Sequence, residues 1–121
     1  MRLDLTIHDL GETAIVRCVG RIVVGETKTL RKAVLSQSNS QTVVLDLAKV
    51  DAIDAAGIGV LVFLHGWAAA LGIDLQLMNP TAHLRELLEL TNLDSVFKIL
   101  SSEEPLWSPR NDVPAIDDTA A

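Results

Sequence analysis

Aromatic residues and cysteine are scarce in this chain of 121 residues: aromatics make up 3% of it and there is one cysteine. A single cysteine excludes an internal disulfide and a cysteine-based zinc site, so a reducing compartment fits best. Because aromatics are so few, the core must be built from the aliphatic side chains that dominate the apolar fraction of 49%. The length is enough for one domain and too short for two.

Basic residues are also in the minority, with 10 Lys and Arg against 16 Asp and Glu and a formal net charge of −6. This balance argues against nucleic acid as the main partner, because phosphate binding requires clustered Lys and Arg. The N-terminus carries charge where a signal peptide needs an apolar run. The longest apolar stretch, residues 55–71, contains three glycines and His65 and predicts a buried helix rather than a membrane span. We therefore expect a cytoplasmic protein without membrane insertion.

The last 21 residues differ from the rest in composition. They hold five acids, one base and three of the four prolines. Acidic, proline-containing sequence without apolar periodicity does not form a packed core. We therefore predict one domain over residues 1–100 and a flexible tail over 101–121, of which residues 103–121 are dispensable for folding.

Five segments have the apolar patterns of strands. Two alternating segments separated by a turn at 9–12 predict an antiparallel hairpin at the N-terminus. A continuous β-branched and leucine run is typical of a strand that is covered on both faces. The predicted strands cover residues 3–7, 14–19, 42–47, 75–77 and 96–100.

Three segments between these strands have helical patterns. The first spans residues 26–36 and the second runs from Gly57 to Leu71. The third begins at 79–81, with Pro80 as its first helical residue. The resulting order, β-β-α-β-α-β-α-β, implies right-handed crossovers onto a mostly parallel α/β sheet. The inner face of the third helix is expected to consist of Leu84, Leu87, Leu88 and Thr91.

The glycines after the third strand do not form a nucleotide-binding motif. Gly57 and Gly59 open a helix, but the third position of a dinucleotide fingerprint is Val62 and no lysine follows for a P-loop. Asp51 and Asp54 could be paired for acid–base chemistry, yet a carboxylate at position 54 is better explained as a cap of the following helix.

The remaining reactive residues also lack partners for catalysis. None of the histidines His8, His65 and His83 has a second ligand at metal spacing, and Cys18 shares a strand face with apolar residues, as a small buried hydrophobe does. The sequence therefore predicts a protein that is not an enzyme and has neither a metal nor a cofactor.

The segment from Val43 to Gly59, VVLDLAKVDAIDAAGIG, resembles the signature of the STAS domain. In that family a hydrophobic strand ending in Leu-Asp-Leu precedes Val-x-x-Ile-Asp-Ser-Ser-Gly-Leu-Gly, which opens a helix. Asp46 and Asp54 match the two aspartates of the pattern. Gly20-Arg21-Ile22 and further matches at 78–84, 90–93 and 97–99 extend the resemblance over residues 3–100. The resemblance implies the STAS fold, whose element order agrees with the one predicted from periodicity.

STAS domains include anti-sigma factor antagonists, and the resemblance implies such a role in a partner-switching pathway. In these proteins a serine or threonine directly before the glycine is phosphorylated by a kinase that is also the anti-sigma factor, and phosphate abolishes binding. Here Ala56 occupies the acceptor position, and Val23 replaces an aspartate that the family places nearby. The resemblance thus implies a module that is not phosphorylated at position 56. It would bind an anti-sigma factor and serine kinase through a loop over 51–57 and the helix start, at Asp54, Ala55, Ala56, Gly57, Ile58 and Gly59.

Two other functions remain open. Small STAS proteins also serve as accessory subunits on the ATPase of phospholipid-transport ABC complexes, and others sense a ligand or nucleotide. The sequence does not predict a homo-oligomer, and it does not name the partner or the sigma factor.

Overall fold

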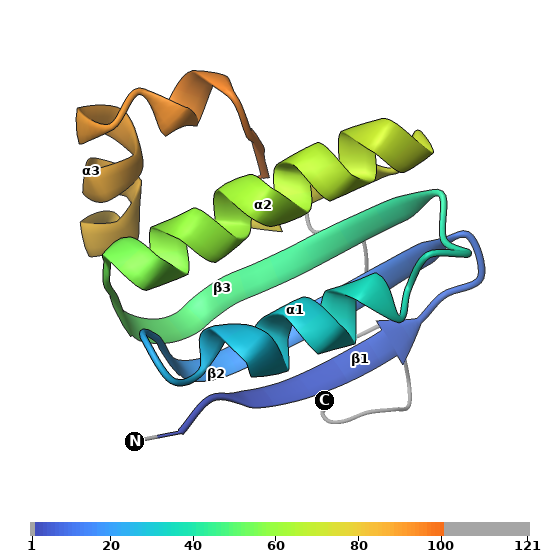
Figure 1. Cartoon of the computed structure of the whole chain (residues 1–121), viewed down its shortest axis with the longest axis horizontal. Coiled ribbons are helices and arrows are strands. Elements are labelled where there is room, and N and C mark those ends of the chain that lie inside the picture. The colour runs from blue at the N-terminus through green and yellow to red at the C-terminus, as the bar shows by residue number, and fades with distance from the viewer. Residues whose placement is uncertain (1, 101–121) are drawn as a thin grey trace.

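A five-stranded mixed sheet in the order β1-β2-β3-β4-β5 is the frame of the protein (Figure 1). The computed structural model describes residues 2–100, so the predicted tail at 101–121 lies outside the described residues. The first two strands form an antiparallel hairpin, and each later strand pairs parallel with the one before it. The strands are β1 (Asp4–Asp9), β2 (Thr13–Ile22), β3 (Thr42–Ile53), β4 (Asp74–Met78) and β5 (Lys98–Leu100).

The helices of the described chain bury their apolar sides in a single core on one face of this sheet. In Figure 1, α1 and α2 cross in front of the strands. Each helix contributes a pair of leucine or valine side chains that have almost no exposed surface. The predicted α/β order and the mostly parallel sheet are confirmed. The helices are α1 (Thr27–Leu35), α2 (Ala55–Leu71) and α3 (Ala82–Leu90), followed by a 3₁₀ turn, η1 (Leu93–Ser95).

Strand β3 is longer than the sequence predicted, because it continues to Ile53 instead of ending at Leu47. The register between β2 and β3 shifts after Arg17 and again after Gly20, so β3 contains extra residues. Such bulges interrupt the two-residue alternation from which a strand is recognised in a sequence. The expected loop over 51–57 is therefore wrong: only Asp54 separates β3 from α2.

The bounds of α3 also differ from the prediction. The helix begins at Ala82, and the hydroxyl of Thr81 accepts a hydrogen bond from the Leu84 amide at 3.3 Å. Pro80 therefore precedes the cap and is not the first helical residue. Thr91 is exposed rather than on the inner face, and its hydroxyl donates to the Leu87 carbonyl at 2.8 Å. The last strand is shortened because η1 precedes it.

Asp46 has a structural role at the first bulge of β3. Its Oδ1 accepts a hydrogen bond from the Ala48 amide at 3.1 Å, within the stretch where the register shifts. Its Oδ2 lies 3.5 Å from Nε of Arg17 on the neighbouring strand. The carboxylate thus satisfies a backbone group that the irregular ladder leaves without a strand partner.

Cys18 is a buried hydrophobe, as the sequence indicated. It has no exposed surface, and its Sγ lies 3.7 Å from the Val16 carbonyl oxygen. Burial, reinforced by the negative charge of Asp46, raises the pKa of the thiol to about 12. Because the thiolate is the reactive form, this cysteine stays protonated and unreactive at neutral pH.

Gly57 marks the closest approach of α2 to the sheet. A Cβ at this position would collide with the backbone carbonyl oxygen of Ile22 and would lie 2.6 Å from Cγ1 of Ile53. The carbonyl belongs to the end of β2 and cannot move without the strand. Only glycine therefore allows the helix to start this close to the sheet, whereas a Cβ on Gly59 would meet open space.

We expect Gly57→Ala to lower the free energy of unfolding by about 1–3 kcal/mol, the usual effect of overpacking. The matched control, Gly59→Ala, should raise it by roughly 0.5–1 kcal/mol, because alanine is the better helix former. Urea denaturation of the two variants and the parent chain measures both values. Equal effects at the two positions would contradict the close approach at Gly57.

Candidate functional site

The carboxylate of Asp54 joins two segments that are 30 residues apart. Its Oδ1 accepts a hydrogen bond from the Gly57 amide at 2.9 Å and so caps α2. Its Oδ2 accepts from the Val24 amide at 3.0 Å, in the turn that follows β2. One side chain therefore fixes both the start of the helix and the neighbouring turn, and the predicted capping role is confirmed.

These two hydrogen bonds also determine the charge of Asp54. The bond from Val24, followed in importance by the bond from Gly57, lowers the pKa of the carboxyl group below its ordinary value. The group is consequently an anion at neutral pH. A carboxylate in this position is favoured by the helix dipole as well.

The predicted binding residues do not all face the same way. Ala55 and Ala56 form the first turn of α2 and are exposed, and Gly59 is exposed one turn further along. Gly57 is buried against the sheet, while Ile58 is half-buried and packs on the core. A partner could therefore contact the two alanines and Gly59, whereas Gly57 acts by placing the helix.

The structure adds a surface that the sequence analysis missed. Val62 and Phe63 are 44% and 48% exposed, and Val24 on the adjacent turn is 74% exposed. The sequence predicts a buried helix over residues 55–71, yet one side of this helix faces outward. Its complete lack of Asp, Glu, Lys and Arg was the available signal. We call this surface the uncharged face, consisting of Val24, Ala55, Ala56, Gly59, Val62 and Phe63.

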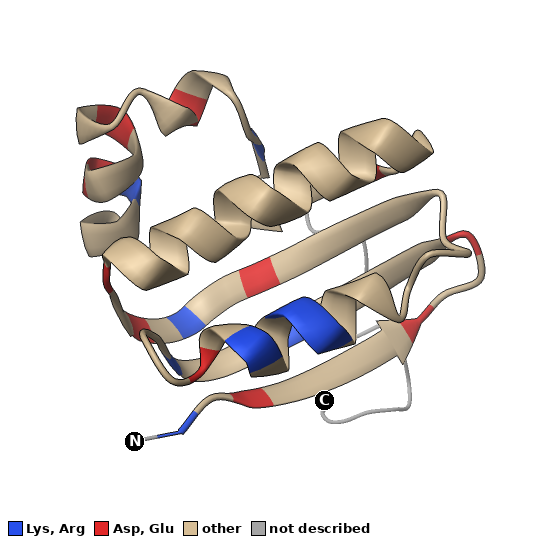
Figure 2. Cartoon of the chain, in the orientation of Figure 1, with Lys and Arg blue, Asp and Glu red and all other residues tan. Residues whose placement is uncertain are grey.

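Helix α1 borders the uncharged face with positive charge. Figure 2 shows α2 without charged residues and blue segments on the adjacent α1. Lys28, Arg31 and Lys32 are exposed on α1. The guanidinium carbon of Arg31 lies 5.8 Å from the centre of the Phe63 ring, within the range of a cation–π contact. The combined surface is apolar along α2 and basic along α1.

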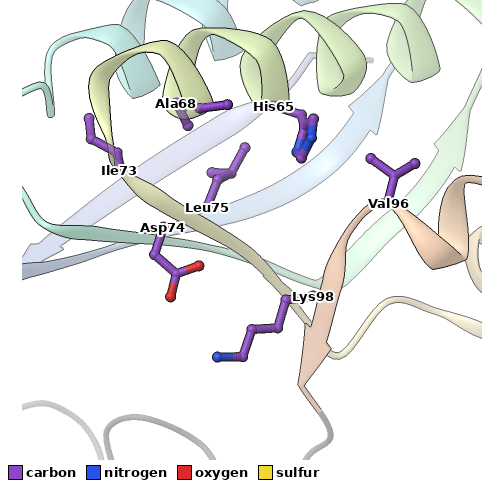
Figure 3. Close-up of a pocket in the computed structure, with 8 residues that line it drawn as sticks. His65, Ala68, Ile73, Asp74, Leu75, Val96 and Lys98 are labelled. Carbon is purple, nitrogen blue, oxygen red and sulfur yellow. The ribbon is translucent and has the colours of Figure 1, made fainter.

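A small pocket lies beside the second half of α2 and the sheet edge (Figure 3). It has a volume of about 160 Å³ and is lined by His65, Ile73, Asp74 and Lys98, among others. Binding sites for small molecules usually measure roughly 300–1,000 Å³. His65 packs edge-on against the Phe97 ring, with centres 5.4 Å apart. The pocket therefore gives little support to a ligand-sensing role.

Within residues 2–100, no three His, Cys, Asp or Glu side chains come close enough together to hold a metal ion. No helix in the same range is long and apolar enough to cross a membrane.

We expect Asp54→Asn to lower the melting temperature at pH 7 by roughly 4–8 °C, since an amide has one acceptor oxygen for two backbone N–H donors. The pKa of Asp54 in the folded state is below its ordinary value of 3.8, so its stabilising effect is complete above that value. The effect is lost as the pH falls through the folded-state pKa.

The difference in melting temperature between the parent and Asp54→Asn should therefore narrow as the pH falls below about 4. Thermal denaturation at pH 7 and pH 3 measures it, with Asp51→Asn removing the same charge from an exposed position on β3. A difference that stays constant with pH would show that the two hydrogen bonds do not depend on the charge.

Solved structures share this architecture at low sequence identity. The unphosphorylated form of the anti-sigma factor antagonist SpoIIAA from Bacillus superimposes with a TM-score of 0.70 at 14% identity, covering 83% of this chain and 90% of that one. An anti-sigma factor antagonist from Mycobacterium paratuberculosis gives 0.72 at 18% identity, over 81% and 85% of the two chains. The murine anion transporter Slc26a9 gives 0.61 at 20% identity, over 69% of this chain and 14% of the transporter.

These similarities establish the fold. The sequence model of the STAS domain matches residues 4–105, which include every strand and helix described above. The mixed sheet with its N-terminal hairpin, the Leu-Asp-Leu strand and the capped helix after it are all present. The chain therefore belongs to the STAS domain family.

Proposed function

We propose that this protein is an anti-sigma factor antagonist, which acts in the cytoplasm by binding an anti-sigma factor rather than by catalysis. The observation that carries the proposal is the uncharged face, which is exposed beside the helix start where the family has its phosphorylated residue. The fold similarity to two antagonists supports the same assignment.

The uncharged face has the chemistry of a protein-binding surface. A partner can exclude water from the exposed Phe63 and Val62 without burying an unpaired charge. The basic residues of α1 would then lie at the rim, where charge guides association and selects the partner. We expect the partner to present an apolar centre flanked by acidic residues.

Ala56 makes binding at this surface independent of the family's phosphorylation switch, because its side chain has no hydroxyl group. Any regulation by phosphate must use another residue, such as Ser95, whose exposed hydroxyl donates to the Asn92 carbonyl at 3.0 Å. The intact mass of the protein after incubation with the partner kinase and ATP shows whether any residue accepts phosphate. Phosphate added at another residue would show a switch outside the helix start.

We expect Ala56→Glu to imitate the phosphorylated state of the family. The exposed carboxylate lies in the first turn of α2 and should leave stability unchanged or raise it by about 0.3–1 kcal/mol. In the complex the new charge must lose its water without gaining a counter-charge, so affinity should fall by about 100-fold or more. Titration against the captured partner, together with melting curves, measures both effects.

The control for this variant is Gln41→Glu, which adds the same charge at an exposed position just before β3, at the opposite end of that strand from Ala56. It should bind like the parent. Equal affinities of the parent chain, Ala56→Glu and Gln41→Glu would show that the start of α2 is not part of the interface. A large loss of stability in Ala56→Glu would contradict the exposed position of residue 56.

A second prediction concerns the outward side of α2. Phe63→Ser should weaken binding by at least about tenfold, because exposed aromatic residues are frequent centres of binding energy. Leu10→Ser is the matched control, since Leu10 is 46% exposed in the β1–β2 turn and is not part of the uncharged face. The same titration measures both variants, and a comparable loss in the two would argue against the uncharged face as the interface.

Affinity capture with the full chain tests the proposal as a whole. Recovery of a kinase-like anti-sigma factor supports it. Recovery of an ABC-type ATPase instead would assign the protein to phospholipid transport. A nucleotide that raises the melting temperature of the free protein would favour the sensor role, because a ligand stabilises the state that binds it.

A further inference from the structure

The face of the sheet opposite the helices carries a second apolar cluster. Ile15 and Val44 have no exposed surface and Met78 is 2% exposed, with Leu100 packed beside them. The strand register pairs Ile15 with Val44, and Met78 with Leu100, so these residues share one face. We call it the back face.

No helix between residues 2 and 100 contributes a side chain to this cluster. The buried residues of α1, α2 and α3 all belong to the other core, on the front of the sheet. A sheet face without a helix normally exposes its side chains to water, and alternates with polar residues for that reason. The full burial of Ile15 and Val44 therefore requires a cover that the helices do not provide.

Gln76 supplies an independent observation on the same face. It pairs with Val44 in register and is 5% exposed. Its Nε2 donates to Oδ2 of Asp74 at 2.6 Å, but its buried Oε1 accepts no hydrogen bond from any residue in the described range. A buried acceptor without a donor is unfavourable. The back face is thus suited to an occupant that brings both apolar surface and an N–H group.

We propose that the C-terminal segment, residues 101–121, packs across the back face with Leu106 and Trp107 over the apolar cluster. The segment continues directly from Leu100, which already belongs to the cluster. Tryptophan combines a large apolar surface with an indole N–H donor, as this face requires. The proposal does not depend on the proposed partner of the uncharged face.

The length of the chain fits this placement. Ile15 lies three strands away from Leu100, which at a strand spacing of about 4.8 Å is roughly 14 Å. The seven residues from Leu100 to Trp107 can extend to about 23 Å. The segment can therefore reach every residue of the cluster and still turn.

Continuity of the chain favours this segment over a second copy of the sheet. The segment is attached to the cluster at Leu100, so its concentration at the back face is set by the length of the chain and not by the protein concentration. The charges of the face do not discriminate between the two occupants, because Asp46 and Asp74 lie on the same face as Arg17 and Lys98. The proposal departs from the flexible tail that composition alone predicted, because composition does not reveal a sheet face that needs covering.

Fluorescence of Trp107 in the full chain tests docking directly. The chain has two tryptophans, so Trp67→Phe leaves Trp107 as the sole emitter. We expect emission shifted to shorter wavelength and acrylamide quenching several-fold weaker than in the same variant unfolded in urea. Quenching equal to that of the unfolded chain would overturn the proposal.

A double-mutant cycle tests where the segment docks. Trp107→Ala should lower the melting temperature by about 4 °C or more in the parent chain, and by clearly less when Val44 is already alanine. The matched control is Val43→Ala, one residue earlier on β3 and part of the front core, in which the two losses should add. Additive losses in both cycles, or no loss on Trp107→Ala, would overturn docking at the back face.

The mass of the protein in solution tests the alternative occupant of the back face, a second copy of the chain. We expect the full chain to elute as a monomer, with a melting temperature that is independent of concentration. A dimer that dissociates on Val44→Asp but is unaffected by Trp107→Ala would overturn the proposal and assign the back face to a second copy.

Discussion

The two hydrogen bonds of Asp54 are the constraint on which the candidate site depends. One carboxylate satisfies the Gly57 amide at the start of α2 and the Val24 amide after β2. The Gly57 amide lies in the first turn of a helix and the Val24 amide lies just after a strand, so each would otherwise need water or another acceptor. Because the same group holds both segments, the exposed residues on either side of it have fixed relative positions.

Gly57 complements this constraint through packing. The helix begins so close to the end of β2 that no side chain fits between them. The first turn of α2 is therefore held from beneath by the sheet, and Ala55 and Ala56 are exposed on a rigid element. A surface that is fixed before binding loses little conformational entropy when a partner covers it. In this chain the first turn of α2 is held rigidly and carries small alanine side chains, which have no hydroxyl group that could be modified.

The apolar side chains on the two faces of the sheet are buried in different ways. The front is covered by three helices that follow the strands in the chain, so each crossover supplies its own cover. The back carries a smaller apolar cluster between charged and polar residues of the same strands. A cover for the back face cannot come from a crossover, because parallel connections of one hand place their helices on one side when the strand order is sequential.

The amino-acid sequence by itself determined the fold class, the element order and the cap. Apolar periodicity indicated the hairpin and the alternation of helices with strands, and the aspartate before a helical pattern indicated the capping role of Asp54, which the structure confirms. These features depend on local physics: the two-residue and 3.6-residue periods and the unpaired amides of a helix start are properties of neighbouring residues. The match to the STAS signature in the same segment identified the family for the same reason, since the motif is continuous in the chain.

Only the tertiary structure decided which apolar residues are exposed at the surface and which are buried. That β3 extends through two bulges to Ile53 depends on its pairing with β2, which is remote in sequence. Which side of an uncharged helix faces outward, and that Phe63 lies beneath Arg31, depends on how α1 and α2 pack together. The presence of a second buried cluster behind the sheet could not be read from strands that are apolar on both sides. Burial is a property of the assembled layers, and a linear pattern records which residues are apolar but not which of them remain in contact with water.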